Sequence, residues 1–247
     1  MGSYRRTAVA AGVFFVVAAV AAVIGLAFYQ PLLHDANYVV SGHGADASIR
    51  TGAFFEVVTV IAVIGTAVSL FPVVRRQNET LALGYVAGRV VEGVLIAVGI
   101  LSLLTVVTLR QAYAGAPGTD ASALVFLQRT LVAVHDWTFL FGPNLALGVN
   151  TSMLAYLMYR SGLVPRLIAM FGLVGGPLIF LSGTAELYGL YTQVSTVGAV
   201  TAVPVFVWEM SLAGWMLIKG FKSAPILIDD RTGNFGINRA AVSGAGQ

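Results

Sequence analysis

The stretch of sequence that decides the fold class is LALGYVAGRVVEGVLIAVGILSLLTVVTL, residues 81–109. It is longer than the roughly 20 apolar residues that a helix needs to cross a bilayer. Its only charged side chains are Arg89 and Glu92. The stretch therefore predicts a membrane-spanning helix that carries two charges in its interior.

The whole chain has the same character. Of its 247 residues, 57% are apolar, which is about 141 side chains, and 10% are charged. A soluble domain has about 25% charged residues, and the mean hydropathy here is +0.85. This composition excludes a soluble enzyme, a disordered chain and a fibrous repeat. Six spans of about 20 residues would use about 120 apolar side chains, so six is close to the maximum.

The apolar segments on either side of residues 81–109 predict an all-α integral membrane helical bundle. A basic stub precedes the first run, as in a signal peptide, but that run exceeds the roughly 7–15 apolar residues of such a peptide. We therefore expect an uncleaved first span, an external loop at residues 29–50, one domain over 1–222 and a polar, flexible cytoplasmic tail at 223–247. The six predicted transmembrane helices are residues 8–28, 51–74, 81–109, 135–159, 167–188 and 200–218.

Residues 121–134 predict a short amphipathic helix at the outer membrane interface, because Gln128 and Arg129 lie off an apolar stripe. The alternative is one helix over residues 120–159, which would be about 60 Å long. We expect a break at His135-Asp136 instead. The apolar stripe consists of Leu124, Leu127, Leu131 and Val134.

Three prolines lie inside predicted spans. Gly142-Pro143 predicts a kink in the fourth span, and Gly175-Gly176-Pro177 predicts a break in the fifth. Pro204 lies in the sixth span. Interrupted helices are typical of transporter sites, although proline also occurs in membrane helices generally.

Basic residues show which ends of the spans face the cytoplasm. Arg50 and Arg110 lie on the predicted outside, with Arg129 near the outer interface. The excess on the other side predicts a bacterial cytoplasmic membrane protein with both termini cytoplasmic. The predicted inside residues are Arg5, Arg6, Arg75, Arg76, Arg160, Arg166, Lys219, Lys222, Arg231 and Arg239.

The net charge of +3 does not indicate a nucleic-acid partner, because the basic residues follow this topology. The chain has no cysteine, so a disulfide framework, a thiolate metal site and a cysteine nucleophile are excluded. No nucleotide-binding loop occurs, and we expect no cofactor. The expected partners are membrane lipids, a small-molecule ligand of unknown identity and a second copy of the chain.

Two blocks carry a family resemblance. They are SLFPVVRRQNETLALGYVAGRVVEGVLIAVGILSLL (residues 69–104) and HDWTFLFGPNLALGVNTSMLAYLMYRSGLVPRLIAMFGLVGGPLIF (residues 135–180). Both resemble a bacterial multi-pass membrane family catalogued as domain of unknown function 4386, with a family span of about residues 4–222. The resemblance implies a multi-helix membrane bundle and no activity.

Ionisable side chains inside spans are costly, by about 2.5–3.5 kcal/mol each near the centre. Arg89 and Glu92 are three residues apart and share a helix face, and Glu209 lies at a similar depth. We predict that Arg89 bonds to both carboxylates. A binding or proton-relay site and a structural ion pair remain alternatives. Gly84 and Gly88 would let a neighbouring helix approach this face.

A second polar set lies nearer the predicted outer face. It could form a metal-dependent hydrolase site, although catalytic zinc usually has more than one histidine ligand. His34 and His43 could add ligands, but their spacing matches no motif. The alternative is that His135-Asp136 anchors the start of a helix. The set consists of Glu56, Arg129, His135, Asp136 and Glu186.

Trp137, Asn144 and Thr151, with Gly148, fall on one face of the fourth span at helical spacing. They predict either interhelical hydrogen bonds or a solute pathway. Three functions remain open at this point. The first is a protein that binds or moves a small solute or lipid. The second is an intramembrane enzyme of the metal-dependent hydrolase type, and the third is an accessory membrane subunit.

Overall fold

The computed structural model describes residues 3–41, 45–113, 116–118, 120–192 and 195–227, and within these ranges the chain forms helices and no strand. The elements are α1 (Ser3–His34), α2 (Tyr38–Ser41), α3 (Asp46–Val74), α4 (Glu79–Tyr113), α5 (Ala121–Phe139), the π-helical η1 (Leu140–Ala146), α6 (Leu147–Ser161), α7 (Arg166–Leu187), α8 (Thr196–Ile218) and the 3₁₀ turn η2 (Pro225–Leu227).

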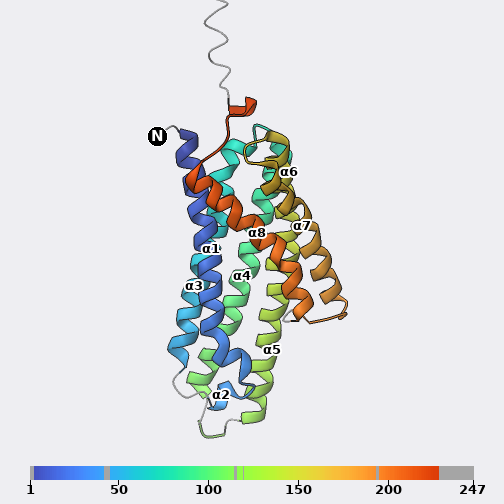
Figure 1. The fold of residues 1–247 in the computed structure, drawn as a ribbon. Coiled ribbons are helices and arrows are strands. Elements are labelled where there is room, and N and C mark those ends of the chain that lie inside the picture. Colours follow the sequence, from blue (N-terminus) through green and yellow to red (C-terminus); the bar gives the residue numbers. More distant parts are fainter. Residues whose placement is uncertain (1–2, 42–44, 114–115, 119, 193–194, 228–247) are drawn as a thin grey trace, which may run out of the picture.

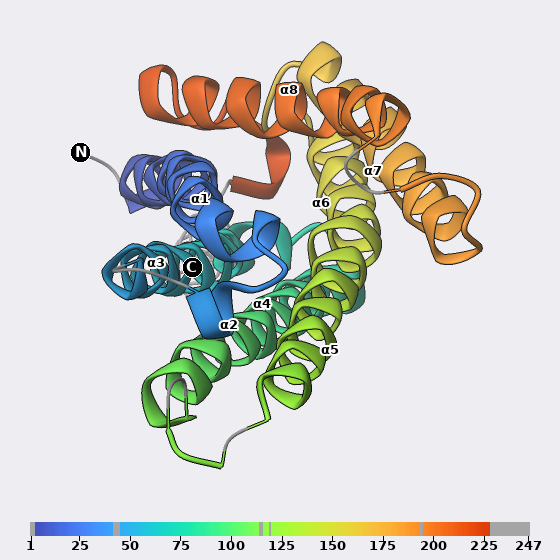
Figure 2. The ribbon, with the colours of Figure 1, turned by 90° about the horizontal axis from the view of Figure 1, so that it is seen from below.

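The helices form a bundle in which the chain runs in alternating directions, with α5, η1 and α6 together forming one of the passes (Figure 1). Among the described residues, five helices are long and apolar enough to cross a membrane, namely α1, α3, α4, α7 and α8. Viewed along the bundle, α8 lies across one side, where it packs on both α1 and α7 (Figure 2). The predicted all-α fold with several apolar helices long enough to cross a membrane is therefore confirmed, whereas the predicted count of six spans is not.

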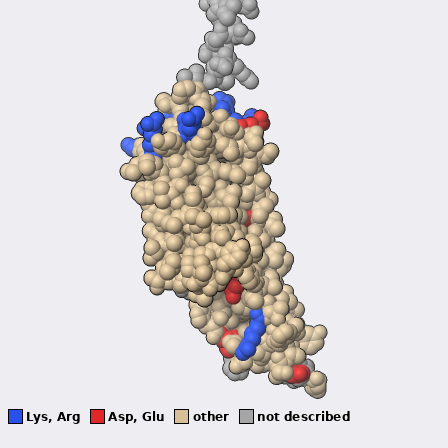
Figure 3. Space-filling view, turned by 90° about the vertical axis from the view of Figure 1, so that its right-hand side faces the viewer, with Lys and Arg blue, Asp and Glu red and all other residues tan. Residues whose placement is uncertain are grey.

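The two ends of the bundle differ in charge. Lysine and arginine gather at one end, here called the basic end, and the broad band below it shows few charged side chains (Figure 3). At the basic end, Arg5 donates to the carbonyl oxygens of Met216 (3.0 Å) and Leu217 (2.7 Å). A cation at a helix C-terminus is favoured by the helix dipole, so Arg5 fastens α1 to the end of α8.

Local signals in the sequence set several helix ends. The Asn78 side chain accepts a hydrogen bond from the Leu81 amide at the start of α4 (2.9 Å). Asp120 and Ser195 cap α5 and α8 through the amides of Ser122 and Gly198. Gly162 ends α6 with φ +69°, a conformation that favours glycine.

The predicted short interfacial helix at residues 121–134 and the predicted break at His135-Asp136 are both wrong. Residues 121–161 form one uninterrupted helix, with a π-helical segment at 140–146 around Pro143, and α5 packs along α4. The predicted apolar stripe is also only partly right, because Leu127 is 43% exposed while Gln128 is buried. Gln128 is buried because it bridges two backbone groups: it accepts from the Val39 amide (2.8 Å) and donates to the Asp35 carbonyl (2.7 Å).

Two further boundaries differ from the sequence predictions. The predicted break in the fifth span is absent, since α7 continues through Gly175-Gly176-Pro177. The glycines serve close packing instead: a Cβ on Gly175 would lie 2.8 Å from the Val205 amide nitrogen. The predicted loop at residues 29–50 is shorter than expected, because α1 extends to His34 and α3 begins at Asp46. The first residues of the predicted tail, 223–227, pack on the core instead, with Ala224 buried, and the rest of the predicted tail lies outside the described residues.

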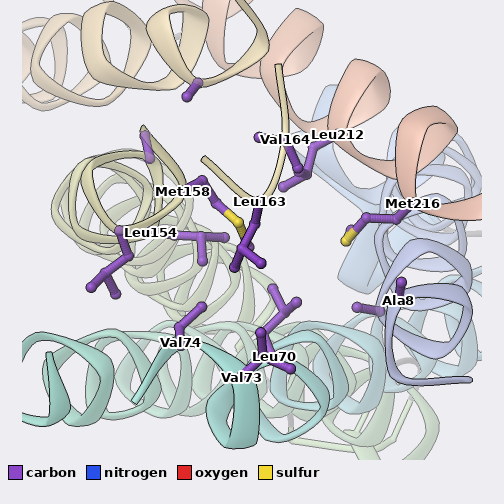
Figure 4. Packing of buried hydrophobic residues seen from close by; sticks show 14 of the residues in the cluster. Ala8, Leu70, Val73, Val74, Leu154, Met158, Leu163, Val164, Leu212 and Met216 are labelled. Atoms are coloured by element: carbon purple, nitrogen blue, oxygen red, sulfur yellow. The ribbon is translucent and has the colours of Figure 1, made fainter. Parts of the chain in front are cut away.

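The apolar core has two parts. The larger lies at the basic end, where side chains from α1, α3, α4, α6, α7, α8 and the turn after α6 converge (Figure 4). The smaller lies between α1, α2, α3, α4 and α5 at the opposite end, around Tyr29, Ile49 and Leu103. The region between these two cores holds Glu56, Arg89, Glu92 and Glu209.

Candidate functional site

A cavity of about 290 Å³ lies between the two cores. Its walls come from α1, α3, α4, α5, η1, α6 and α8, and most of the lining side chains are apolar. Charged and polar groups are confined to a few positions at its two ends. The lining residues are Phe15, Ala18, Ala19, Ala22, Val23, Leu26, Glu56, Thr59, Val63, Thr66, Arg89, Glu92, Ile96, Gly99, His135, Thr138, Phe139, Pro143, Leu147 and Glu209.

Arg89 lies at the end of the cavity nearer the basic end, and it makes two ion pairs. Its Nη1 lies 3.2 Å from Glu92 Oε2 on the same helix, and its Nη2 lies 2.8 Å from Glu209 Oε1 on α8. The side chains of Arg89 and Glu92 are 3% and 5% exposed, and that of Glu209 is 19% exposed. The contacts predicted for Arg89 are therefore present. We call Arg89, Glu92 and Glu209 the central ionic cluster.

Neighbouring side chains hold the cluster in place. The Phe15 and Tyr85 rings lie 5.5 and 5.8 Å from the guanidinium carbon of Arg89, within the range of cation–π attraction. The Tyr85 hydroxyl lies 3.2 Å from Thr66 Oγ1. Since Thr66 donates its own proton to the Val63 carbonyl (2.7 Å), Tyr85 is the donor in this pair.

Asn150 belongs to the cluster, and the sequence analysis missed it. Its amide nitrogen donates to Glu92 Oε2 at 2.7 Å, and the residue is fully buried. The contact depends on Gly88, because a Cβ there would lie 3.0 Å from Asn150 Cβ. The predicted close approach at Gly84 and Gly88 is thus confirmed, with α6 as the neighbour. An amide in an apolar span is the signal that could have identified Asn150.

The central ionic cluster does not balance in charge. One guanidinium faces two carboxylates, so the cluster has one excess negative charge when both carboxylates are ionised. An uncompensated charge in a low-dielectric interior costs several kcal/mol. A proton or a cation at the cluster would remove that cost.

The other end of the cavity carries Glu56 and His135, which are 9% and 5% exposed. Glu56 lies within electrostatic reach of His135 and of the Tyr29 phenol. The rings of Tyr29 and His135 meet edge to face with centroids 6.0 Å apart. The Nδ1 atom of His135 lies 3.2 Å from an oxygen of Asp136, whose side chain is 63% exposed.

The five residues of the predicted outer set do not form one site. Arg129 is exposed on α5. Glu186 lies in a different network, where it accepts from Asn144 (3.0 Å) and Ser182 (3.2 Å), and Ser182 lies 2.8 Å from Thr201. The described part of the chain holds no group of three or more histidine and carboxylate side chains placed to bind a metal ion. His43 lies outside the described residues.

The predicted polar stripe on the fourth span is also divided. Asn144 and Thr151 are buried, whereas Trp137 is 50% exposed. The reason is the π-helical segment between Trp137 and Thr151, because its wider turn rotates the two halves of the helix relative to each other. Gly148 packs against α7, where a Cβ would lie 2.8 Å from the Gly176 carbonyl oxygen.

A second ionic cluster lies at the end of the bundle opposite the basic end, and the sequence analysis did not find it. Asp46 accepts from Arg110 Nε, from Gln111 and from the Tyr38 hydroxyl, each at 2.7 Å. Burial, together with the hydrogen bond to Asp46, raises the pKa of the Tyr38 phenol above its usual range. Since Arg110 also lies over the Tyr38 ring, this cluster ties α2, α3 and α4 together.

A comparison with known families identifies one match. The family model described as "Domain of unknown function (DUF4386)" matches residues 10–220. No curated protein and no solved structure matches the chain. The matched range contains the whole cavity and both ionic clusters.

Proposed function

The chain belongs to the DUF4386 family, and because membership brings no activity with it, we propose a function from the cavity: the protein binds a small amphipathic solute or lipid inside its helix bundle. The observation that carries the proposal is the cavity of about 290 Å³, which has apolar walls and ionisable groups at both ends. A mostly apolar pocket with a few convergent polar groups is typical of small-molecule sites.

The position of the cavity opening supports a ligand that dissolves in the membrane. Ala22, Val23 and Leu26 of α1 line the cavity and are also exposed on the outside of the bundle, Val23 by 69% and Leu26 by 40%. All three lie in the apolar run of the first span, so this mouth faces hydrocarbon. A ligand can therefore reach the cavity from the bilayer.

We propose six membrane crossings, with the helix over residues 121–161 as the fourth. This helix exceeds the thickness of a bilayer, since its two α-helical parts and π segment together span about 60 Å. The start of α5 then extends beyond the membrane with the distal ends of α1, α3 and α4, while its last residues, which line the cavity, lie within it. The charge asymmetry supports a bacterial cytoplasmic membrane, both termini in the cytoplasm and one membrane domain over residues 1–222.

A more specific version of this proposal is that the protein moves the solute across the membrane. The π-helical segment at 140–146 lies against the cavity through Pro143, and such segments are frequent at functional sites. Glu92 and Glu209 share one arginine, so gain or loss of a proton there could couple transport to a proton gradient. Proton uptake during transport by the protein in liposomes would test this form.

The binding proposal is tested by closing the mouth. In Ala22→Trp the indole should fill the opening and abolish binding of small amphipathic probes, measured by equilibrium dialysis of the purified protein. Ala27→Trp is the matched control, because Ala27 is exposed on α1 but does not line the cavity. Probe binding that survives in Ala22→Trp at the wild-type level would contradict the proposal.

The topology is tested by reporter fusions. Fusions after Arg75, Arg160 and Lys222 should report cytoplasm, and fusions near Gly115 and Thr196 should report the outside. A fusion near Gly44 should also report the outside. One reversed hairpin would rule out the six-span arrangement while leaving the cavity itself in place.

A further inference from the structure

We propose that the ligand of this cavity is an amphipathic organic cation, a protonated amine or quaternary ammonium with an apolar body, which enters from the bilayer. This inference rests on the proposed function and names the chemical class of the ligand. It follows from the charges in the cavity, from the way Arg89 is occupied, and from the character of the walls and the mouth.

The first observation is the charge of the lining. Three carboxylates line the cavity, Glu56, Glu92 and Glu209, and Arg89 is the only lysine or arginine among the lining residues. His135 can add at most one further positive charge. A low-dielectric cavity strengthens the field of this acidic excess, so the cavity favours a cation over a neutral or anionic molecule of the same shape.

The second observation is that Arg89 offers an anion no accessible donor, since its Nε atom, which has no hydrogen-bond partner among the described residues, is buried. Its Nη1 and Nη2 atoms already donate to Glu92 and Glu209, and the rings of Phe15 and Tyr85 lie beside the guanidinium. A phosphate or carboxylate ligand would have to displace these carboxylates. The member of the cluster that a ligand can reach is Glu209, whose side chain is 19% exposed and lines the cavity.

The third observation is the wall between the cluster and the mouth. Ala18, Ala19 and Ala22 of α1 are small and apolar, and Ile96 and Leu147 face the same space. An apolar body would lie along this wall, with its charged group at Glu209. The volume of about 290 Å³ is at the lower end of the roughly 300–1,000 Å³ of small-molecule sites, which favours a ligand with one short apolar chain or ring.

The test compares three probes that share one phenylbutyl body, namely 4-phenylbutylamine, 4-phenylbutanol and 5-phenylpentanoate. Binding is measured by equilibrium dialysis at neutral pH with the full chain in nanodiscs of zwitterionic lipid, and binding to empty nanodiscs is subtracted. The amine should bind at least about tenfold more tightly than the alcohol, and the carboxylate more weakly than both, because one favourable charge contact of this kind is worth about a factor of ten.

Variants assign this preference to the cluster. Glu209→Gln should reduce the affinity for the amine about tenfold while leaving the affinity for the alcohol unchanged. Glu186→Gln is the matched control, because Glu186 is a partly buried carboxylate in α7 that does not line the cavity. If Glu209→Gln does not yield folded protein, Glu56→Gln removes a carboxylate from the other end of the cavity and should reduce the preference for the amine about threefold.

The possible outcomes distinguish failure of the cationic-ligand proposal from failure of the binding proposal. Equal binding of amine and alcohol, or tighter binding of the carboxylate, with all binding lost in Ala22→Trp, would overturn the cationic ligand and leave the binding cavity in place. Amine selectivity that persists unchanged in Glu209→Gln and Glu56→Gln would also overturn it. If none of the three probes binds above the level of Ala22→Trp, the proposed function fails as well.

Discussion

The protein contains two arginine–carboxylate clusters that use similar contacts in different surroundings. In the central ionic cluster, Arg89 pairs with Glu92 and Glu209 and is 3% exposed at its side chain. In the second ionic cluster, here called the distal cluster, Arg110 pairs with Asp46, and their side chains are 21% and 14% exposed. In both, an aromatic ring lies less than 6 Å from the guanidinium carbon, at 5.5 Å for Phe15 and 5.8 Å for Tyr38.

The difference between the clusters shows what burial does to an ion pair. Water can replace a lost partner in the distal cluster, so each contact there contributes little to stability. At Arg89 the side chain is sealed between helices, and a carboxylate left alone there would keep its full desolvation cost. The central ionic cluster is also unbalanced in charge, whereas Asp46 and Arg110 neutralise each other.

The largest effect is expected for Arg89→Ala. It leaves two buried carboxylates without a cation and should destabilise the protein by about 3–5 kcal/mol, seen as a lower apparent Tm in detergent. The triple variant Arg89→Ala, Glu92→Gln, Glu209→Gln should recover part of the loss, because it removes the charges as well. Arg129→Ala, at an exposed arginine of α5, is the control and should leave the Tm unchanged. A single Arg89→Ala variant as stable as wild type would show that water reaches the cluster.

Asn150→Ala should have the next largest effect. The substitution removes the 2.7 Å hydrogen bond from Asn150 to Glu92, so a buried carboxylate oxygen of Glu92 loses a donor. The cost should be about 1–3 kcal/mol of stability. Thermal unfolding in detergent measures the loss. Thr105→Ala is the control, since the Thr105 hydroxyl is exposed and bonds only to the Leu101 carbonyl of its own helix. Equal effects of the two substitutions would contradict a role for Asn150 in the cluster.

Arg110→Ala should cost less, at most about 1 kcal/mol, because the pair is partly exposed. Added salt should reduce the difference in Tm between wild type and Arg110→Ala, since screening acts on exposed pairs. The same salt series should leave the difference between wild type and Arg89→Ala unchanged. A salt response of equal size at both arginines would remove the distinction between the two clusters.

Tyr38→Phe should have the smallest effect at neutral pH, below about 1 kcal/mol, because Asp46 keeps its bonds to Arg110 and Gln111. A difference should appear in alkali. Since burial and the bond to Asp46 raise the pKa of Tyr38 in the folded state, the unfolded chain ionises first, near pH 10. Stability is therefore retained below about pH 10 and lost above it. Between about pH 9 and 11, the Tm should therefore fall less steeply with pH in Tyr38→Phe than in wild type. Identical slopes in the two proteins would contradict the raised pKa of the Tyr38 phenol.

Predictions from the sequence succeeded where a single helix carries the information. The length of the apolar runs gave the membrane class, and the spacing of Arg89 and Glu92 placed them on one face because a helix repeats every 3.6 residues. Equal distance from the basic turns predicted that Glu209 would reach Arg89, which the 2.8 Å contact confirms. The Gly84–Gly88 track correctly predicted close helix packing.

Predictions failed where packing against neighbouring helices determines the local structure. A break at His135-Asp136 was expected because a 60 Å helix seemed too long for a bilayer, but α4, with 35 residues, is also longer than a bilayer needs, and α5 packs along it. Gly175-Gly176-Pro177 continues as a helix, with α8 packed closely against Gly175 and α6 against Gly176. Glu186 was grouped with Glu56 by depth alone, yet it faces Asn144 and Ser182 instead.

The sequence by itself determined that this chain is an all-α membrane bundle and which charged groups lie inside its spans, because hydrophobicity and helical period are properties of local segments. Only the tertiary structure decided that Asn150 completes the central ionic cluster, that Asp46 meets Arg110, and that Glu56 and His135 share one cavity with Arg89. The physical reason is that depth along a helix can be counted from the sequence. The direction in which each helix face points is fixed by packing against the other helices, and at residues 140–146 by one π-helical segment.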